Sequence, residues 1–197
     1  MACKPYQIEG VLSEIKEELR GKALISIAAG WNYDKYEEYL DKSTRFQFIM
    51  PNTPAMVGEG MTALCVNDLV TEEETALAVK LCNTFGKTEV IPERLMDVVV
   101  GVSGSSPAYV FMFLEAMADA AVADGMPRAQ AYKFAAQAVL GSAKLMLETG
   151  KHPGELKDMV CSPAGTTIQA VRVLEEKGLR SAVFEAQTTC VNKAKGM

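Results

Sequence analysis

The sequence predicts an α/β unit followed by an all-α unit within a chain of 197 residues. Helical and strand patterns alternate from residue 6 to residue 91 with short connections, which is typical of a sheet built from parallel strands. After Pro92 no further strand pattern occurs, and helical patterns fill the rest of the chain. The first strand is apolar without alternation, as in strands that are covered on both faces. We therefore expect two domains, residues 1–92 and residues 93–197.

Glycine, proline and capping residues divide the first half into elements. An amphipathic helix ends before Gly21, and Pro51 stops a strand because proline cannot continue a sheet. Thr71 has the position of a helix N-cap, and Glu74 completes a capping box with it. The expected elements are a helix at 6–19, a strand at 24–29, a helix at 33–40, strands at 45–50 and 62–66, a helix at 72–85 and a strand at 88–91.

The strand at 24–28 needs a neighbour on each side, because a covered apolar strand is normally central in its sheet. The sequence ahead of it supplies one helix and no strand pattern. We therefore expect this strand to form an open edge of the sheet, and the α/β domain to lack the units that would precede it.

The second half begins with a helical pattern at 96–102. The next segment predicts an N-cap at Ser106, with Pro107 at the first helical position. Further helices are expected at 128–147, 167–177 and 180–193.

The helix that follows Ser106 is apolar around almost its whole circumference. Between residues 109 and 122 only Glu115 and Asp119 are charged, and they share one stripe of the helix. A domain of this size has too little mass of its own to bury such a helix. We expect a homodimer interface there, with Gly101, Gly104 and Ala108 allowing close approach of a second subunit.

Composition argues against several classes of function. A net charge of -5 gives no basic surface for nucleic acid or for an anionic membrane. The five cysteines lack a CxxC pair and suggest reduced intracellular thiols, while the single histidine, His152, leaves no histidine cluster for a metal. We find no apolar run of membrane-spanning length and no signal-peptide core. We expect a cytoplasmic protein without a metal site.

A loop of small and hydroxylated residues leads into an amphipathic helix near the end of the chain. Ser162 and Pro163 predict a turn, and Thr166 with Gln169 has the spacing of a capping box. Backbone N–H groups at a helix start, with hydroxyl groups beside them, suit a small carboxylate. A plain helix start is the alternative reading of the same residues.

Longer motifs around this loop carry a family resemblance. MVCSPAGTTIQAVRVLEEKG at 159–178 and GVSGSSPAYVFMFLEAMADAAVADGMPRAQAY at 101–132 resemble 1-pyrroline-5-carboxylate reductase, and CKP, SIAAG, MPNTPA and HPGELKDMV agree in the same order. The resemblance implies a Rossmann dinucleotide-binding domain followed by a helical domain for dimerisation and substrate binding. Members of the family begin with a strand, a GxGxxG turn and a helix, which this sequence lacks. We therefore expect a partial Rossmann-type parallel sheet without its first βα units.

The resemblance also implies hydride transfer from NADPH or NADH to the C=N bond of 1-pyrroline-5-carboxylate, which gives L-proline. Ser162 and the backbone N–H groups of Thr166 and Thr167 would hold the substrate carboxylate. The hydroxyl of Thr167 would meet the ring nitrogen, which makes Thr167 the expected catalytic residue. Its alternative role is to cap the helix. Ala164 stands where the family usually has glycine.

On the cofactor side, the resemblance places Lys4 near the ribose and phosphates and Ala28, Ala29 and Gly30 along the nicotinamide. Without the resemblance, Lys4 is a solvated lysine and Gly30 is turn punctuation. The complete set of implied cofactor residues is Lys4, Pro5, Ala28, Ala29, Gly30 and Asn52.

Two other hypotheses stay open at this point. A catalytically inactive remnant would keep only the dimerising helical domain, because each charge-assisted hydrogen bond that a glycine-rich turn makes to pyrophosphate contributes roughly 1.5–3 kcal/mol. A helical scaffold that merely resembles the enzyme would require the hydroxyl loop to be dispensable.

Overall fold

The computed structural model describes residues 1–28 and 30–196. The chain separates into two compact units, one formed by Met1–Pro107 with the last residues from Gln187, and the other by Ala108–Ala186. The first unit contains all strands of the described chain, and the second is helical. The expected fold class, α/β followed by all-α, is confirmed.

The sheet has four strands in the order β1-β2-β3-β4. The strands are β1 (Ala23–Ser26), β2 (Arg45–Met50), β3 (Gly60–Val66) and β4 (Gly86–Val90). Two pairs, β1 with β2 and β3 with β4, are parallel, whereas β2 and β3 are antiparallel. This middle pair corrects the expectation of a wholly parallel sheet. The connection from β2 to β3 contains only the short 3-10 helix η2 (Thr53–Val57), and parallel neighbours need a longer crossover.

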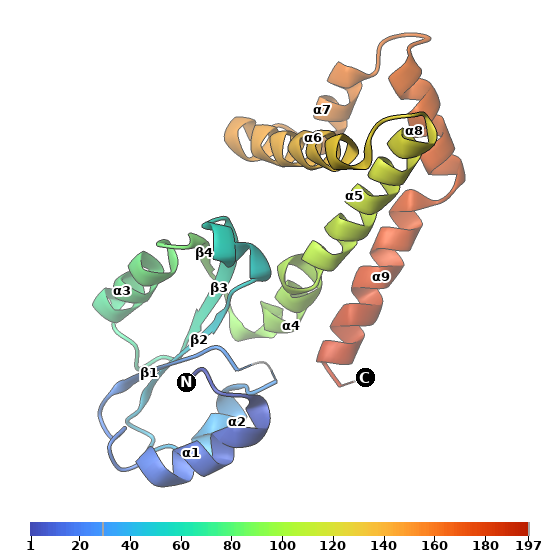
Figure 1. Ribbon diagram of the computed structural model, residues 1–197. Helices are drawn as coiled ribbons and strands as arrows, with labels where there is room; N and C mark the ends of the chain where they lie inside the picture. Colours follow the sequence, from blue (N-terminus) through green and yellow to red (C-terminus); the bar gives the residue numbers. More distant parts are fainter. Residues whose placement is uncertain (29, 197) are drawn as a thin grey trace. The chain divides into compact units, whose positions relative to one another are not determined.

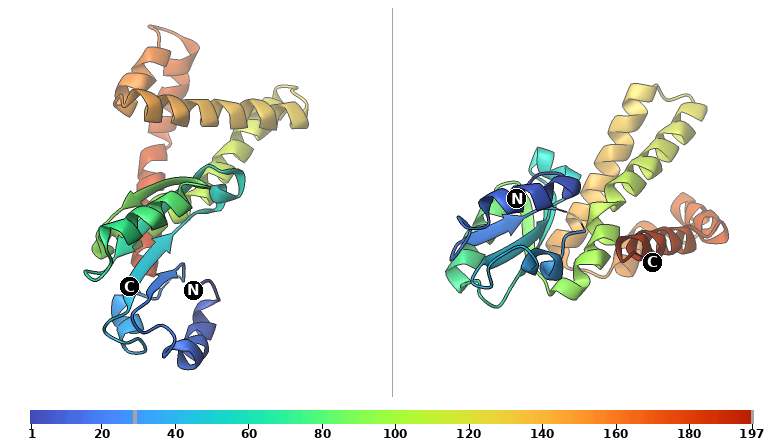
Figure 2. Two further views of the ribbon diagram at one scale, coloured as in Figure 1. Left: turned by 90° about the vertical axis from the view of Figure 1, so that its left-hand side faces the viewer. Right: turned by 90° about the horizontal axis from the view of Figure 1, so that it is seen from below.

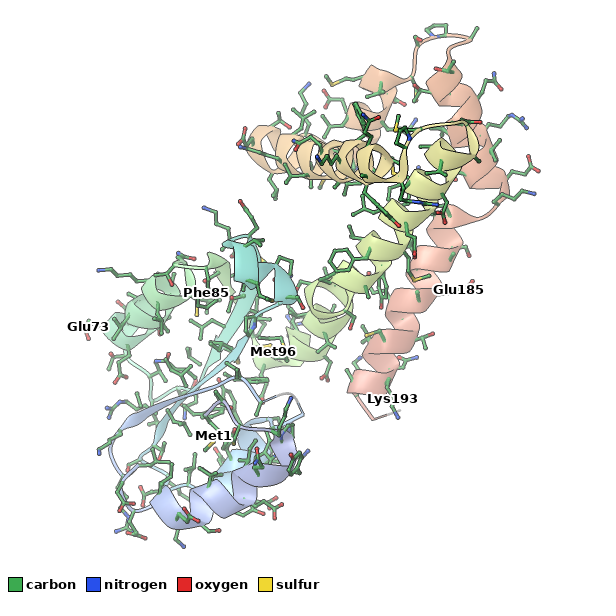
Figure 3. The ribbon with its side chains drawn as sticks, viewed as in Figure 1. Met1, Glu73, Phe85, Met96, Glu185 and Lys193 are labelled. Carbon is green, nitrogen blue, oxygen red and sulfur yellow. The ribbon has the colours of Figure 1, made fainter. Side chains whose placement is uncertain are left out.

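Strand β1 lies at an edge of the sheet and pairs only with β2 among the strands, as the sequence predicts. The main chain of Met1 lies against its open side (Figure 3). The Met1 amino group donates to the Ile25 carbonyl at 2.5 Å, and the Ile27 N–H donates to the Met1 carbonyl at 3.0 Å. The burial on both faces that we expect for residues 24–29 is incomplete, because Ile27, directly after β1, is 41% exposed.

Helices cover both faces of the sheet (Figures 1 and 2). On one face, α1 (Ile8–Ile15) and α2 (Tyr33–Glu37) contribute to the larger core. On the other face, α3 (Glu72–Cys82) packs through Ala78 and Cys82. A further 3-10 turn, η1 (Pro5–Gln7), leads into α1. Helices on opposite faces explain why the strands lack a regular polar alternation.

The capping box that starts α3 forms as predicted. The Glu74 N–H donates to Thr71 Oγ1 and the Thr71 N–H donates to Glu74 Oε2, each at 3.2 Å. Arg45 on β2 also donates from Nε to Glu74 Oε1 at 2.8 Å. The cap therefore ties the start of α3 to the start of a strand.

A helical run follows the sheet through η3 (Glu93–Leu95), α4 (Met96–Val99), the π-helical turn η4 (Val100–Gly104) and α5 (Ser106–Ala123). Ser106 is therefore not the N-cap that the sequence predicts. Its hydroxyl donates to the Val102 carbonyl at 2.6 Å within the continuing helix. Gly101 does allow close approach, but to its own chain, because a Cβ there would lie 2.8 Å from Val191 Cγ2.

The run Glu93–Ala123 also corrects the expectation that no apolar stretch reaches membrane-spanning length. In the described part of the chain it is one helical stretch of 31 residues with a mean hydropathy of 1.4 in its most apolar window, enough to cross a membrane by length and composition alone. Only 6% of that window is buried within this chain. On α5, Phe111 is 62% and Met112 is 70% exposed. The burial that we expect for this helix is therefore not supplied by a single copy.

The helical unit continues with α6 (Arg128–Thr149), α7 (Pro153–Val160), α8 (Thr166–Glu176) and the first part of α9 (Leu179–Ala194). Helix α7 has no counterpart among the predicted helices. His152 is its N-cap and accepts from the Gly154 N–H at 3.1 Å through Nδ1, and Pro153 takes the first helical position. No element was expected for these residues, although the His152 cap and Pro153 at the first helical position specify a short helix.

Candidate functional site

The hydroxylated loop is a tight turn that ends at α8. The Gly165 N–H donates to the Ser162 carbonyl at 3.0 Å, with Pro163 in the second position of the turn. Ala164 in the third position has φ 57°, the only non-glycine residue with positive φ in the described chain. Proline second and a left-handed residue third are the signature of a type II turn, which favours glycine at the third position.

Helix α8 begins without a side-chain cap. Its N-cap is Gly165, and no side chain accepts from the first turn at this position. The predicted capping box of Thr166 with Gln169 is therefore wrong, because Thr166 is already the first helical residue. The N–H groups of Thr166 and Thr167 belong to the helix start, where no intrahelical acceptor exists.

The turn brings three predicted site residues to one helix end. Ser162 and Thr166 are exposed and Thr167 is half-buried. The Ser162 hydroxyl lies over Gly165, since a Cβ built on Gly165 would be 2.4 Å from it. Backbone donors, a hydroxyl and the positive end of the helix dipole together make a seat for a small anion.

A cavity of about 760 Å³ lies in the sheet unit at the carboxyl ends of β1 and β2. Open α/β sheets bind ligands at this edge. Of the predicted cofactor residues, Gly30 lines this cavity. Its other lining residues are Trp31, Asn32, Lys35, Phe48, Met50, Glu93, Arg94, Met96, Asp97, Val100, Ala194 and Lys195.

Lys35 is a residue of this cavity that the sequence analysis missed. Its Nζ donates to the Gly30 carbonyl at 2.7 Å, and its N–H donates to the Asn32 side chain, the N-cap of α2, at 3.2 Å. The lysine thus fixes the loop that follows β1. The one signal in the sequence was the position of Lys35, five residues beyond the last glycine of the SIAAG motif.

Glu93 joins the same cavity to α2. Its Oε1 accepts from the Tyr33 N–H at 3.0 Å across 60 residues of sequence. The Tyr33 hydroxyl donates to Cys65 Sγ at 3.1 Å, and burial raises the pKa of Tyr33 above its ordinary value. Tyr33 therefore stays neutral and serves as a partly buried hydrogen-bond donor.

The other predicted cofactor residues have different surroundings. Lys4 and Pro5 are exposed at the start of η1. Ala28 is buried, and its N–H donates to Ser26 Oγ at 3.2 Å. Ala29 lies outside the described residues. Asn52 is half-buried, and its amide donates to the Ser103 carbonyl at 3.0 Å and accepts from the Met61 N–H at 2.9 Å.

The predicted residues therefore form two groups. The substrate group, Ser162 with the two threonines, belongs to the helical unit, and the described cofactor residues belong to the sheet unit. Within residues 1–28 and 30–196, no three His, Cys, Asp or Glu side chains gather as metal ligands would.

Comparison with known proteins assigns the family. The family model for pyrroline-5-carboxylate reductase dimerisation matches residues 93–197. The pyrroline-5-carboxylate reductase of Escherichia coli K12 is 61% identical over 194 residues, which are 98% of this chain and 72% of that protein. The chain belongs to the pyrroline-5-carboxylate reductase family. The enzyme of the same name from Methanosarcina acetivorans is 46% identical over 99% of this chain and 73% of its own length.

Solved pyrroline-5-carboxylate reductase structures share the fold. The Coxiella burnetii protein superposes with a TM-score of 0.93 at 36% identity, over 98% of this chain and 73% of that one. The Plasmodium falciparum pyrroline carboxylate reductase, solved with NADP bound, gives a TM-score of 0.90 at 33% identity, over 98% of this chain and 78% of that one. The predicted resemblance to pyrroline-5-carboxylate reductase is thereby confirmed.

Proposed function

We propose that this chain reduces 1-pyrroline-5-carboxylate to L-proline by hydride transfer from NADPH or NADH. The observation that supports this proposal most is the N-terminal start of α8. There the Ser162 hydroxyl and an uncapped first turn with two threonines form a seat for a carboxylate. Family membership supports the reaction, since the matched relatives are named for it.

The substrate carboxylate would be held by Ser162 and the N–H groups of Thr166 and Thr167. Charge-assisted hydrogen bonds of this kind contribute roughly 1.5–3 kcal/mol each. They would fix the ring in one orientation, which is what a hydride acceptor requires.

Thr167 is the proposed catalytic residue. It stands in the first turn of α8 without a capping role, so its hydroxyl is available to the ring nitrogen of a substrate whose carboxylate lies on the helix start. A hydroxyl that orients and relays a proton is sufficient when the imine reacts in its protonated form.

The cofactor would occupy the carboxyl edge of β1 and β2. The cavity there carries three cationic side chains, Lys35, Arg94 and Lys195, and two carboxylates, Glu93 and Asp97. The excess of positive charge suits an anionic dinucleotide. The reduced nicotinamide supplies the hydride. This chain's residues would hold it: Lys4 and Pro5 near the ribose and phosphates, Ala28, Ala29 and Gly30 along the nicotinamide, and Asn52 at the neighbouring turn.

We also propose a cytoplasmic homodimer, with residues 1–92 as the dinucleotide domain and 93–197 as the dimerisation and substrate domain. The exposed apolar face of α5 supports the dimer, because monomers rarely expose such a surface. The family match to a dimerisation region over residues 93–197 supports the same boundary.

The test is a direct assay of the purified chain. NADPH oxidation that depends on 1-pyrroline-5-carboxylate, with L-proline as the product, is the expected result. A second candidate is a non-catalytic dimer, supported by the family model for the dimerisation region, which matches residues 93–197. It predicts dimerisation and proline binding at α8 without any NADPH oxidation.

A further inference from the structure

The Ser162 hydroxyl owes its position to the residue three places further on. A Cβ built on Gly165 would lie 2.4 Å from Ser162 Oγ and 3.1 Å from the Ser162 carbonyl oxygen. Carbon and oxygen atoms that are not bonded do not approach to 2.4 Å. Any side chain at residue 165 therefore displaces the Ser162 hydroxyl.

The backbone of Gly165 does not itself require glycine. Gly165 has φ -72° and ψ 168°, an extended conformation open to any residue. The strained position of the turn is its neighbour, Ala164, with φ 57°. The backbone conformation of Gly165 would therefore accept any residue, whereas that of Ala164 favours glycine. Glycine at residue 165 leaves the space that the Ser162 hydroxyl occupies.

We propose that Gly165 is a positioning residue: it leaves room for the Ser162 hydroxyl over the start of α8, so that this hydroxyl and the Thr166 and Thr167 N–H groups bind one carboxylate. This inference rests on the proposed function, which makes that helix end the substrate seat. Gly165 acts through Ser162 and touches no reacting atom.

The geometry makes the effect of a Gly165 side chain depend on Ser162. Ser162→Ala removes the hydroxyl. The Cβ of residue 162 then lies 3.6 Å from a Cβ added at residue 165, which is an ordinary contact. Gly165→Ala then has only the carbonyl at 3.1 Å to accommodate. The two substitutions must therefore couple.

The test is a double-mutant cycle on the 197-residue chain with wild type, Ser162→Ala, Gly165→Ala and the double variant. L-Proline binding is followed by the NMR shifts of the Thr166 and Thr167 amides, and stability by urea unfolding. Pyrrolidine, which lacks the carboxylate, is the ligand control. Gly178→Ala is the matched protein control, because Gly178 has φ +73° and an open Cβ position at the far end of the same helix.

We expect Gly165→Ala to weaken proline binding about tenfold or more in the wild-type background and to add no further loss in the Ser162→Ala background. Gly178→Ala should lower stability and leave proline affinity unchanged. An equal loss in both backgrounds, or an unchanged affinity in Gly165→Ala, overturns the proposal. If wild type shows no proline-dependent shift, the proposed function fails. Coupling of the two substitutions in the unfolding free energies would then still establish that a residue-165 side chain displaces the Ser162 hydroxyl. Additive unfolding free energies would overturn that displacement as well.

Discussion

Asn52 holds the main-chain carbonyl of Ser103, with its Nδ2 3.0 Å from the carbonyl oxygen. The same amide accepts from the Met61 N–H at 2.9 Å, so one side chain joins the turn after β2, the start of β3 and the π-helical turn η4. π-Helical turns are rare within α-helices and frequently occur at functional sites. Asn52 stabilises one at the point where the sheet unit runs into α5.

The first prediction concerns this amide. Asn52→Ala removes a donor and an acceptor from two half-buried main-chain partners, and should lower the free energy of unfolding by about 1–3 kcal/mol in urea denaturation. Asn52→Asp keeps the acceptor and should lose less. Unchanged stability in both variants would contradict a structural role for these two hydrogen bonds.

The second prediction concerns Thr167. Because Gly165 is the N-cap of α8, Thr167→Ala removes no cap and should change stability by less than about 1 kcal/mol. Turnover should fall about 10- to 100-fold, and Thr167→Ser should recover much of it because the hydroxyl survives. If the 197-residue chain alone shows no turnover, the variants are compared in a chimera with the rest of the E. coli relative. Full turnover with a lower melting temperature in Thr167→Ala would make this residue structural.

The third prediction concerns Ala164, the described non-glycine residue with left-handed backbone. A side chain at such a φ destabilises the folded state by about 1–2 kcal/mol. Glycine relieves this strain, but its greater flexibility in the unfolded state offsets part of the stabilisation. Ala164→Gly should therefore raise stability by about 0.5–1 kcal/mol in thermal or urea unfolding. A loss of stability would show that the turn is not strained.

The fourth prediction concerns assembly. Phe111→Asp places a charge on the exposed apolar face of α5, and should convert a homodimer to monomers in sedimentation at micromolar concentration. Leu77→Asp is the control, since Leu77 on α3 is 67% exposed, comparable with Phe111 at 62%. Wild type sedimenting as a stable monomer, or both variants remaining dimeric, would contradict an α5 interface.

The fifth prediction concerns acid stability. The Thr71 N–H, followed by Arg45, holds the pKa of Glu74 below its ordinary value. A carboxyl group with a lowered folded pKa stabilises the protein above its ordinary pKa, and that contribution disappears as the pH falls through the folded value. Urea unfolding of Glu74→Gln should therefore show a smaller loss of stability below about pH 4.5 than wild type. Identical pH profiles would rule out this coupling.

Local sequence determined the elements whose signals lie within a few residues of one another. The Thr71–Glu74 box formed because both partners lie in one helical turn, and the Ser162–Gly165 turn formed around its proline. The edge position of β1 was predictable because no strand pattern precedes it. The apolar circumference of α5 likewise predicted an apolar surface that one chain leaves exposed.

Tertiary structure decided what depends on residues far apart in the chain. Asn52 reaches Ser103 across 51 residues, and Gly101 packs on Val191 of α9, so neither partner is visible in a local pattern. The antiparallel pairing of β2 with β3 follows from a short link, while the strand patterns themselves fit either direction. Ser106 was predicted to be an N-cap because a serine followed by proline is a common helix start. The π-helical turn before it instead continues the helix into α5. Long-range packing overrides such signals, because one backbone hydrogen bond or cap contributes about 1 kcal/mol and a packed helix face contributes more.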